Sequence, residues 1–140
     1  MALLNIVLYP APVLLAVGKS IEVFDEKLET LVENMFETMY AAGGVGLAAP
    51  QINESKRLFV MDCSRGENAP RRFAMINPEI IMREGEQTGD EGCLSFPGIH
   101  MEIKRELRTV ARYQDVAGNW QELDVTELEA RCVLHETDHC

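Results

Sequence analysis

Six short segments between residues 57 and 125 have the composition of β-strands, and a helical pattern lies on each side of them. The segments contain β-branched or aromatic residues and are bounded by Gly, Pro or Asn, as strands separated by turns usually are. They cover residues 57–62, 72–77, 79–83, 99–104, 108–115 and 120–125. Ala117-Gly118-Asn119 is predicted to form the tip of a hairpin between the last two. This order of elements predicts an α+β fold with a mostly antiparallel sheet.

The first helical pattern covers residues 26–42. Apolar residues recur along it at intervals of three and one, from Leu28 to Tyr40, and therefore form one stripe. Asp25 is a suitable N-cap, and Gly43-Gly44 is a suitable stop signal. We expect an N-terminal helix that packs this stripe on the core.

The second helical pattern starts at about Glu127 and closes the chain. Thr126 and Glu129 have the spacing of a capping box, with Thr126 as the N-cap. Four residues of this helix are separated by intervals of three or four and therefore lie on one face: Leu128, Cys132, His135 and His139.

Length, composition and charge indicate a single domain and exclude some classes of binding partner. The chain has 140 residues, 46% of them hydrophobic, and we expect a single globular domain over residues 1–140. It carries 13 Lys and Arg against 23 Asp and Glu, a net charge of −10, which disfavours direct binding to nucleic acid or to an anionic membrane. No apolar run reaches the ~18–20 residues of a membrane span. Prolines interrupt the N-terminal apolar segment and no signal peptide is evident, so we expect a cytoplasmic protein without a disulfide framework.

The run His135-Glu136-Thr137-Asp138-His139 has the H-E-x-x-H pattern. Residues at i and i+4 of a helix lie one above the other, so both imidazoles can reach one metal ion. Glu136 lies on the adjacent face, where a carboxylate can exchange protons with a water molecule. Two imidazoles do not complete a metal site, and a third ligand must come from elsewhere.

The segment Glu91-Gly92-Cys93-Leu94-Ser95 is the best source of that ligand. A Cys93 thiolate with two imidazoles and an open position is a catalytic metal arrangement. A plain buried thiol is the alternative for this cysteine. Cys132 is expected to line a pocket wall, and Cys63 and Cys140 have no ligand-like setting.

A third segment runs from Gly44 to Gln51. Gly44-x-Gly46-x-x-Ala49 matches the dinucleotide-binding pattern, with Asp62 near the position of its ribose-binding acid. The segment follows a helix rather than a strand, and Pro50 lies in what would be the first turns of the next helix, so we reject that interpretation. We expect an extended edge that a peptide backbone can approach, with Gln51 as an amide donor.

These three segments, in this order, resemble the three motifs of the peptide deformylase family, and the similarity covers most of the chain. The resemblance implies an enzyme that removes the formyl group from the N-terminal formylmethionine of new polypeptides. It also implies that Cys93, His135 and His139 bind one divalent metal ion. In the family this is Fe²⁺ in the cell, with Ni²⁺, Co²⁺ or Zn²⁺ also able to occupy the site.

The resemblance assigns the catalytic roles as well. The ion would lower the pKa of a bound water, which attacks the formyl carbon. Glu136 would act as general base and then as general acid toward the departing amine. The Gln51 side chain and the Leu94 backbone N–H would hold the developing oxyanion. Glu91 would accept a hydrogen bond from a ligand imidazole and fix its tautomer.

The substrate would be the N-formylmethionyl end of a nascent peptide. Gly46 could pair with its backbone, and Val45, Leu128 and Cys132 could line an apolar pocket for the methionine side chain. Arg105 and Asp138 match positions that pair structurally in the family. Family members usually continue beyond the second metal histidine, so we expect a short form without the segment that docks on the ribosome. We also expect a monomer that works near the ribosome.

Two other functions remain open at this point. One is an H-E-x-x-H endopeptidase, whose third ligand normally follows the motif. The other is a metal-stabilised, inactive module that binds peptide N-termini. A module would need a fourth protein ligand, from Cys132 or Cys140, and would have no use for Glu136.

Overall fold

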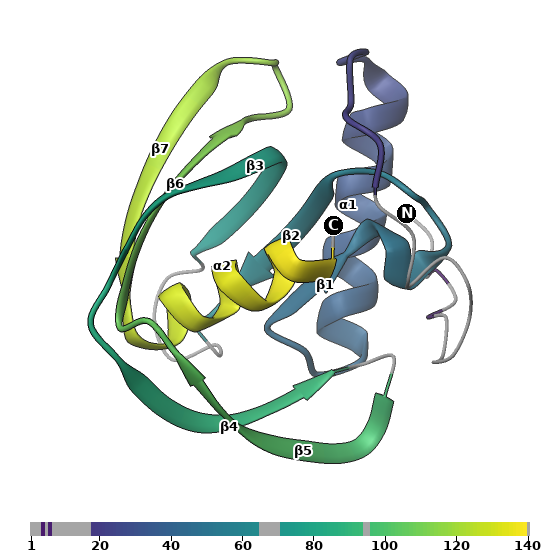
Figure 1. Cartoon of the computed structure of the whole chain (residues 1–140). Coiled ribbons are helices and arrows are strands. Elements are labelled where there is room, and N and C mark those ends of the chain that lie inside the picture. The colour runs from purple at the N-terminus through teal and green to yellow at the C-terminus, as the bar shows by residue number, and fades with distance from the viewer. Residues whose placement is uncertain (1–3, 5, 7–17, 65–70, 94–95, 140) are drawn as a thin grey trace.

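The structure is a computed structural model of the whole chain (Figure 1). It describes residues 4, 6, 18–64, 71–93 and 96–139; for residues 90–93, 96–102 and 139 it describes the backbone alone. Leu94 lies outside the described residues, as do the side chains of Glu91, Cys93 and His139.

A five-stranded antiparallel sheet forms the centre of the molecule, with strand order β1-β2-β3-β6-β7 (Figure 1). Its strands are β1 (Gly46–Ala48), β2 (Leu58–Asp62), β3 (Arg72–Glu84), β6 (Arg108–Gln114) and β7 (Trp120–Thr126). A short 3₁₀ helix, η2 (Ala49–Ile52), directly follows β1. Two further strands, β4 (Gln87–Cys93) and β5 (Phe96–Arg105), pair antiparallel in a sheet of their own. The predicted fold class, α+β with a mostly antiparallel sheet, is confirmed.

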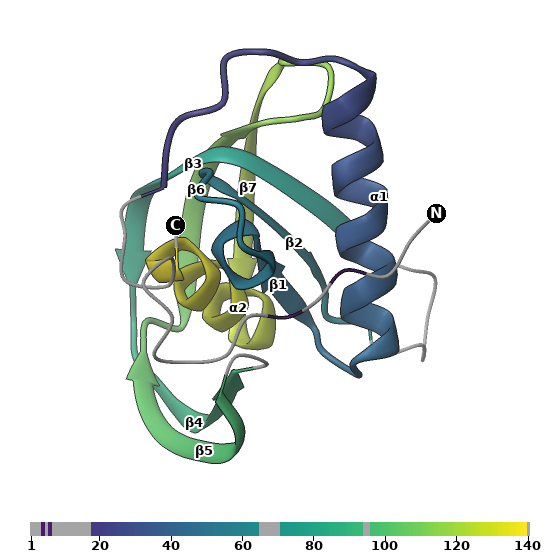
Figure 2. The same cartoon turned by 90° about the vertical axis from the view of Figure 1, so that its right-hand side faces the viewer.

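Helices α1 (Glu26–Ala41) and α2 (Glu127–His139) cover opposite faces of the central sheet (Figure 2). The side chains of β2 show this division, because successive residues of a strand point to opposite faces. Leu58 and Val60 join the apolar cluster under α1, whereas Phe59 and Met61 join the cluster under α2. Every residue of β2 is buried, so this strand is the middle layer of the fold.

Helix α1 matches its prediction except at its C-terminal end, where Tyr40, the last residue of the predicted stripe, is exposed and the helix stops one residue earlier than expected. Asp25 is the N-cap, and its Oδ1 accepts a hydrogen bond from the Leu28 N–H at 3.1 Å. The helix ends at Ala41, before Gly43 with its φ of 73°. Met35 and Met39 of the predicted stripe are fully buried against the sheet. Within the described residues, no helix is long and apolar enough to cross a membrane.

Helix α2 starts as predicted at Glu127, but its start differs from the predicted capping box. Thr126 is still the last residue of β7, and Glu127 turns the chain into the helix with a φ of 55°. The Glu127 N–H donates to the Leu107 carbonyl at 2.9 Å, and the Glu129 carboxylate accepts from Arg71 Nε at 2.8 Å. Strand and helix therefore meet without a loop.

Three strand predictions need correction. Residues 72–77 and 79–83 were expected to be separate strands because of Pro78, yet they form the single strand β3. The register to β6 shifts between Ile76 and Glu79, and this irregularity accommodates the proline. Strand β4 was not predicted, because Thr88 is the one strand-forming residue in its polar, Gly-containing sequence. Strand β5 begins earlier than the expected residue 99.

The predicted hairpin with its tip at Ala117-Gly118-Asn119 is confirmed. The chain turns between β6 and β7, and the Gly118 N–H donates to the Asp115 carbonyl at 2.9 Å. The Asp115 side chain accepts from the N–H groups of Ala117 and Asn119, each at 3.0 Å. Gly118 has a φ of 86°, which favours glycine at this position.

Asn77, at the irregularity in β3, joins three segments of the chain. It has a φ of 51°. Its side chain accepts from the Ile21 N–H at 2.8 Å and donates to the Ile21 carbonyl at 2.8 Å and to Gln114 Oε1 at 2.7 Å. These bonds attach the segment before α1 to the sheet.

We predict that Asn77→Ala lowers the free energy of unfolding by about 2–4 kcal/mol, because it removes three hydrogen bonds and places Ala at positive φ. Asn77→Gly keeps the conformation and loses only the bonds, so it should cost less. Asn53→Ala, at an exposed residue with a φ of 63°, is the control for backbone strain. Urea unfolding measures all three. Equal losses for Asn77→Ala and Asn53→Ala would contradict a role for the hydrogen bonds.

A second polar connection joins α1 to the end of β2. The Tyr40 hydroxyl donates to Asp62 Oδ2 at 2.6 Å, and Asp62 Oδ1 accepts from the Ser64 N–H at 2.9 Å. Partial burial of the Tyr40 side chain, which is 47% exposed, and its hydrogen bond to Asp62 raise the pKa of Tyr40 to about 12. Burial raises the pKa of Asp62, but hydrogen bonds from Ser64, Tyr40 and Arg71 outweigh it, and the pKa lies below its usual 3.8.

The pKa of Tyr40 predicts a loss of stability at high pH. From the usual tyrosine pKa of 10.0 up to about 12, the unfolded chain releases the phenol proton while the folded protein keeps it. The free energy of unfolding should therefore fall over this range. Tyr40→Phe lacks this contribution, so its disadvantage relative to the parent protein should shrink between pH ~8 and pH ~11. Urea midpoints at both pH values test this, and a constant difference would contradict it.

Candidate active site

The first and third predicted motifs meet where β1 packs on α2. Gly46 opens β1, and a Cβ atom built on it would lie 2.9 Å from Cys132 Sγ and 3.0 Å from Glu136 Cγ. Separations this short leave no room for a side chain. The missing Cβ of Gly46 thus allows the β1 backbone to lie directly against the part of α2 that carries Glu136.

Gln51 lies in η2, immediately after β1, and is almost completely buried. Its Oε1 accepts a hydrogen bond from the Ala48 N–H at 2.9 Å. This contact occupies the acceptor end of the amide, so Nε2 is the end that acts as a donor. The sequence predicted an amide donor at this position, and the structure shows how the backbone of β1 orients it.

Helix α2 presents His135 and Glu136 side by side. Glu136 is 5% exposed, and its Oε1 lies 3.8 Å from His135 Nε2. Because the helix extends without interruption from Glu127 to His139, His135 and His139 have the i, i+4 relation that the motif requires. A buried carboxylate next to an imidazole is a typical setting for proton transfer.

The second motif lies at the end of β4. Cys93 is the last residue of this strand and pairs with Phe96, and a register shift separates this pair from the pair before it. Glu91 pairs with Met101. The side chains of Glu91, Cys93 and His139 lie outside the described set, as does Leu94, so their predicted roles stay predictions. Within the described side chains, no three His, Cys, Asp or Glu form a metal-binding group.

The four predicted substrate-binding residues fall in two places. Gly46 and Val45 lie at the start of β1, and the Cys132 thiol contacts the Val45 carbonyl at 3.7 Å. Cys132 is 6% exposed and Val45 is partly buried beside the same cluster. Leu128 lies one turn earlier on α2 and is half-buried. Three of the four residues are thus close together, and the binding role itself stays a prediction.

The rejected nucleotide pattern has a different structural role here. Residues 44–49 follow a helix and enter β1 and η2, rather than leading from a strand into an α-helix. Asp62, the residue at the ribose-binding spacing, is buried and accepts hydrogen bonds from Tyr40, Ser64 and Arg71. The pattern thus describes an edge strand, as we expected.

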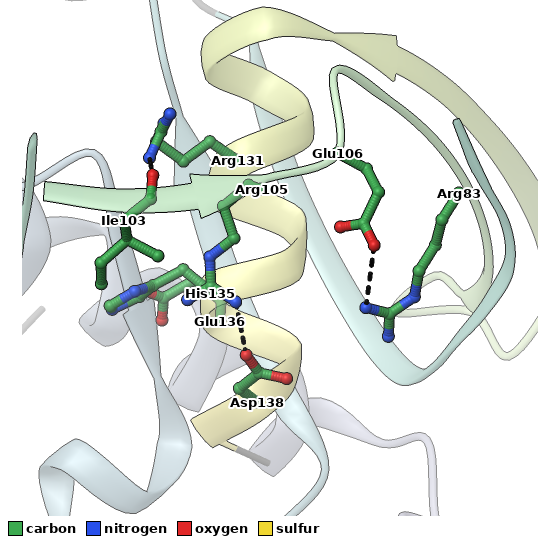
Figure 3. A network of polar contacts seen from close by, with 8 residues as sticks. All are labelled: Arg83, Ile103, Arg105, Glu106, Arg131, His135, Glu136 and Asp138. Atoms are coloured by element: carbon green, nitrogen blue, oxygen red, sulfur yellow. Dashed lines mark hydrogen bonds and ion pairs between the residues drawn. The ribbon is translucent and has the colours of Figure 1, made fainter. Parts of the chain in front are cut away.

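Two arginines connect α2 to the β4–β5 hairpin (Figure 3). Arg105 of β5 donates to Asp138 Oδ2 at 2.7 Å, a pairing that the family resemblance suggested. Arg131 of α2 donates to the Ile103 carbonyl at 3.0 Å and was not among the predicted site residues. Its signal in the sequence was a charged residue within the apolar run 130–134 of this helix.

The arrangement places a buried glutamate, a histidine and an oriented amide around the junction of β1 with α2. Comparison with known proteins shows which family has this sequence and fold. The family model described as polypeptide deformylase matches residues 3–140. The chain belongs to the polypeptide deformylase family.

Individual relatives agree with the family match. The chain is 49% identical to a peptide deformylase of Acidobacterium capsulatum over 134 residues, which cover 96% of this chain and 79% of the relative. It is also 49% identical to a peptide deformylase of Xylella fastidiosa, covering 99% of this chain and 82% of the relative. The crystal structure of a peptide deformylase from Thermotoga maritima superposes with a TM-score of 0.93 at 41% identity, covering 99% of this chain and 92% of that one.

These matches confirm the predicted family and the predicted enzyme class, a peptide deformylase and thus a hydrolase. They favour this function over an H-E-x-x-H endopeptidase, because the similarity extends along the chain and is not confined to the five-residue motif. The single domain over residues 1–140 stays a prediction.

The close approach at Gly46 generates a prediction. Gly46→Ala should lower the free energy of unfolding by about 1–3 kcal/mol, because the new methyl group overlaps Cys132 Sγ. In a Cys132→Ala background the sulfur is absent, and the same substitution should cost less. A double-mutant cycle followed by urea unfolding measures the coupling. Additive effects, within about 0.5 kcal/mol, would contradict the packing argument.

Proposed function

We propose that the protein is a metal-dependent hydrolase that removes the N-formyl group from the formylmethionine of nascent polypeptides. The observation that carries this proposal is the buried Glu136 beside His135, on a helix that packs against the glycine-containing edge strand β1. The family membership supports the reaction, and the residues around Glu136 support the mechanism.

The residues fit a divalent metal ion, with Cys93, His135 and His139 as its ligands. The i, i+4 histidines lie on one continuous helix, and the cysteine ends a strand whose hairpin is hydrogen-bonded to that helix. Thiolate and imidazole ligands suit Fe²⁺, Ni²⁺, Co²⁺ and Zn²⁺, and we propose Fe²⁺ for the cell. When bound, the ion supplies Lewis-acid polarisation of the formyl oxygen and acidifies a water molecule.

Glu136 moves the protons of the reaction. Its carboxylate accepts a proton from the attacking water as the bond to the formyl carbon forms. It then delivers a proton to the amine nitrogen as the C–N bond breaks, and formate leaves. The burial of Glu136 keeps the carboxylate in one position, which favours proton transfer over a fixed distance.

Gln51 and the edge strand orient the substrate. The Ala48 N–H binds Oε1 of Gln51, so the N–H donors of this amide point away from Ala48. We propose that these donors stabilise the developing oxyanion together with the Leu94 N–H. The peptide backbone would add to the edge of β1 near Gly46, and Val45, Leu128 and Cys132 would contact the methionine side chain. We also propose Glu91 as the hydrogen-bond acceptor for a ligand imidazole.

The proposed partners are nascent N-formylmethionyl peptides, encountered by a monomer in the cytoplasm near the ribosome. Electrostatics supports a peptide substrate over nucleic acid, because the net charge of −10 repels phosphates.

The test is formate release from a short formyl-Met peptide by protein purified without oxygen and supplied with Fe²⁺ or Ni²⁺. We predict rapid release by the parent protein and a loss of about 10²–10⁴-fold in kcat for Glu136→Gln, because that variant lacks the proton acceptor. Chelation should abolish the activity, and added metal should restore it.

Glu129→Gln is the matched control, because Glu129 lies on the same helix but has no role in the proposed chemistry. Its carboxylate pairs with Arg71 at a distance of 2.8 Å. It should keep its activity. A folded, metal-loaded parent protein that releases no formate would overturn the proposal and favour an inactive module that binds peptide N-termini.

A further inference from the structure

The β4–β5 hairpin depends on the rest of the protein for its position. Within the part of the chain that the structure describes, its two strands pair with each other and with no other strand, in a sheet separate from the central one. A two-stranded hairpin alone is marginally stable in water, and contacts with another element are needed to hold it. The hairpin matters for function because β4 carries Glu91 and ends at Cys93.

Arg131 makes such a contact from the middle of α2. Its Nη1 donates to the Gly89 carbonyl at 3.2 Å and to the Ile103 carbonyl at 3.0 Å, and its Nη2 contacts Gln87 Oε1 at 3.4 Å. Gly89 of β4 and Ile103 of β5 are direct partners in the hairpin. One guanidinium group therefore binds both strands at the same position, and Figure 3 shows the side chain reaching β5.

The strand residue opposite Arg131 is a glycine, Gly89, which leaves space for the guanidinium group. A Cβ atom built on Gly89 would lie 3.1 Å from Arg131 Nη2 and 3.3 Å from Cζ. The missing Cβ at Gly89 thus lets the guanidinium lie close to the strand. Arg131 is only 7% exposed, so its hydrogen bonds are made largely away from water.

Among the described side chains, two further connections between α2 and the hairpin lie near the ends of the helix. Gln87 Nε2 donates to the Glu127 carbonyl at 2.8 Å, and Arg105 reaches Asp138 at 2.7 Å. The Asp138 side chain is 59% exposed, and exposed ion pairs contribute little, typically about 0–1 kcal/mol. Arg131 lies between these two connections along the helix, is largely buried, and comes one turn before His135.

We propose that Arg131 is a positioning residue that holds the β4–β5 hairpin, and with it Cys93, at the correct separation from His135. The inference rests on the proposed function, because it assigns Arg131 a role through the metal ligands. Arg131 itself does not touch the substrate or the reacting atoms. It sets the geometry between a ligand on a strand and a ligand on a helix.

The test compares Arg131→Met and Arg131→Lys with the parent protein. Lysine keeps the charge but presents no planar fork for two carbonyls. Arg72→Met is the matched control, because Arg72 of β3 likewise reaches a helix, through Glu33 of α1 at 3.1 Å. Gly89→Ala is a second variant that displaces the guanidinium while leaving Arg131 intact.

The first readout is hydrogen exchange in metal-free protein. We expect Arg131→Met and Gly89→Ala to accelerate exchange at the β4–β5 amides, while Arg72→Met leaves these amides unchanged. The second readout is Co²⁺ binding, followed by competition with a chelator and by the thiolate-to-cobalt charge-transfer absorption. We expect Arg131→Met to weaken Co²⁺ binding about 10–100-fold with a weaker charge-transfer band, Arg131→Lys to lie between it and the parent, and Arg72→Met to match the parent.

The outcomes separate this inference from the proposed function. If the parent protein shows the charge-transfer band and Arg131→Met keeps both the band and the Co²⁺ affinity, the positioning role is wrong, even where the melting temperature falls. If the parent protein binds Co²⁺ without that band, the ligand assignment of the proposed function fails, and the role of Arg131 toward Cys93 fails with it.

Discussion

The rest of the structure depends on the burial of β2 between two helices. Leu58 and Val60 contact the cluster under α1, and Phe59 and Met61 contact the cluster under α2. A strand that is buried on both sides pairs in one register, because a slip by one residue would exchange the two sets of side chains. Strand β1 pairs with β2, and its register places Gly46 opposite Met61. The same packing that forms the core therefore fixes where the edge strand meets Glu136.

The sequence predicted the elements whose pattern is local. Helix α1 and the β6–β7 hairpin carry their signals within a few residues, as a stripe with caps and as a turn around Gly118. The continuity of β3 through Pro78 was missed, because it rests on pairing with β6 across a register shift, and that pairing joins residues far apart in the sequence. Strand β4 was missed for a related reason: its polar residues become a strand only through pairing with β5.

The candidate site shows the same division. Three short motifs led to the prediction of Glu136, Gln51 and the metal ligands as candidate site residues, because residue type and spacing are visible in the sequence. The orientation of Gln51 by Ala48 could not be predicted, since it requires the turn of η2. Arg131 was missed because its partners are mostly backbone carbonyls, and any sequence provides those.

The junction between β7 and α2 has a consequence for how this fold can vary. Because Glu127 follows Thr126 directly, with a φ of 55° and no loop, the rotation of the helix about its axis is inherited from the strand. Each helical residue turns the helix by about 100°, so one inserted residue here would turn Cys132 and Glu136 away from Gly46 of β1. Insertions and deletions should therefore be absorbed at turns such as Asp115–Asn119 and excluded from residues 126–127. In evolutionary terms, a junction of fixed length keeps the active-site face of α2 turned toward β1.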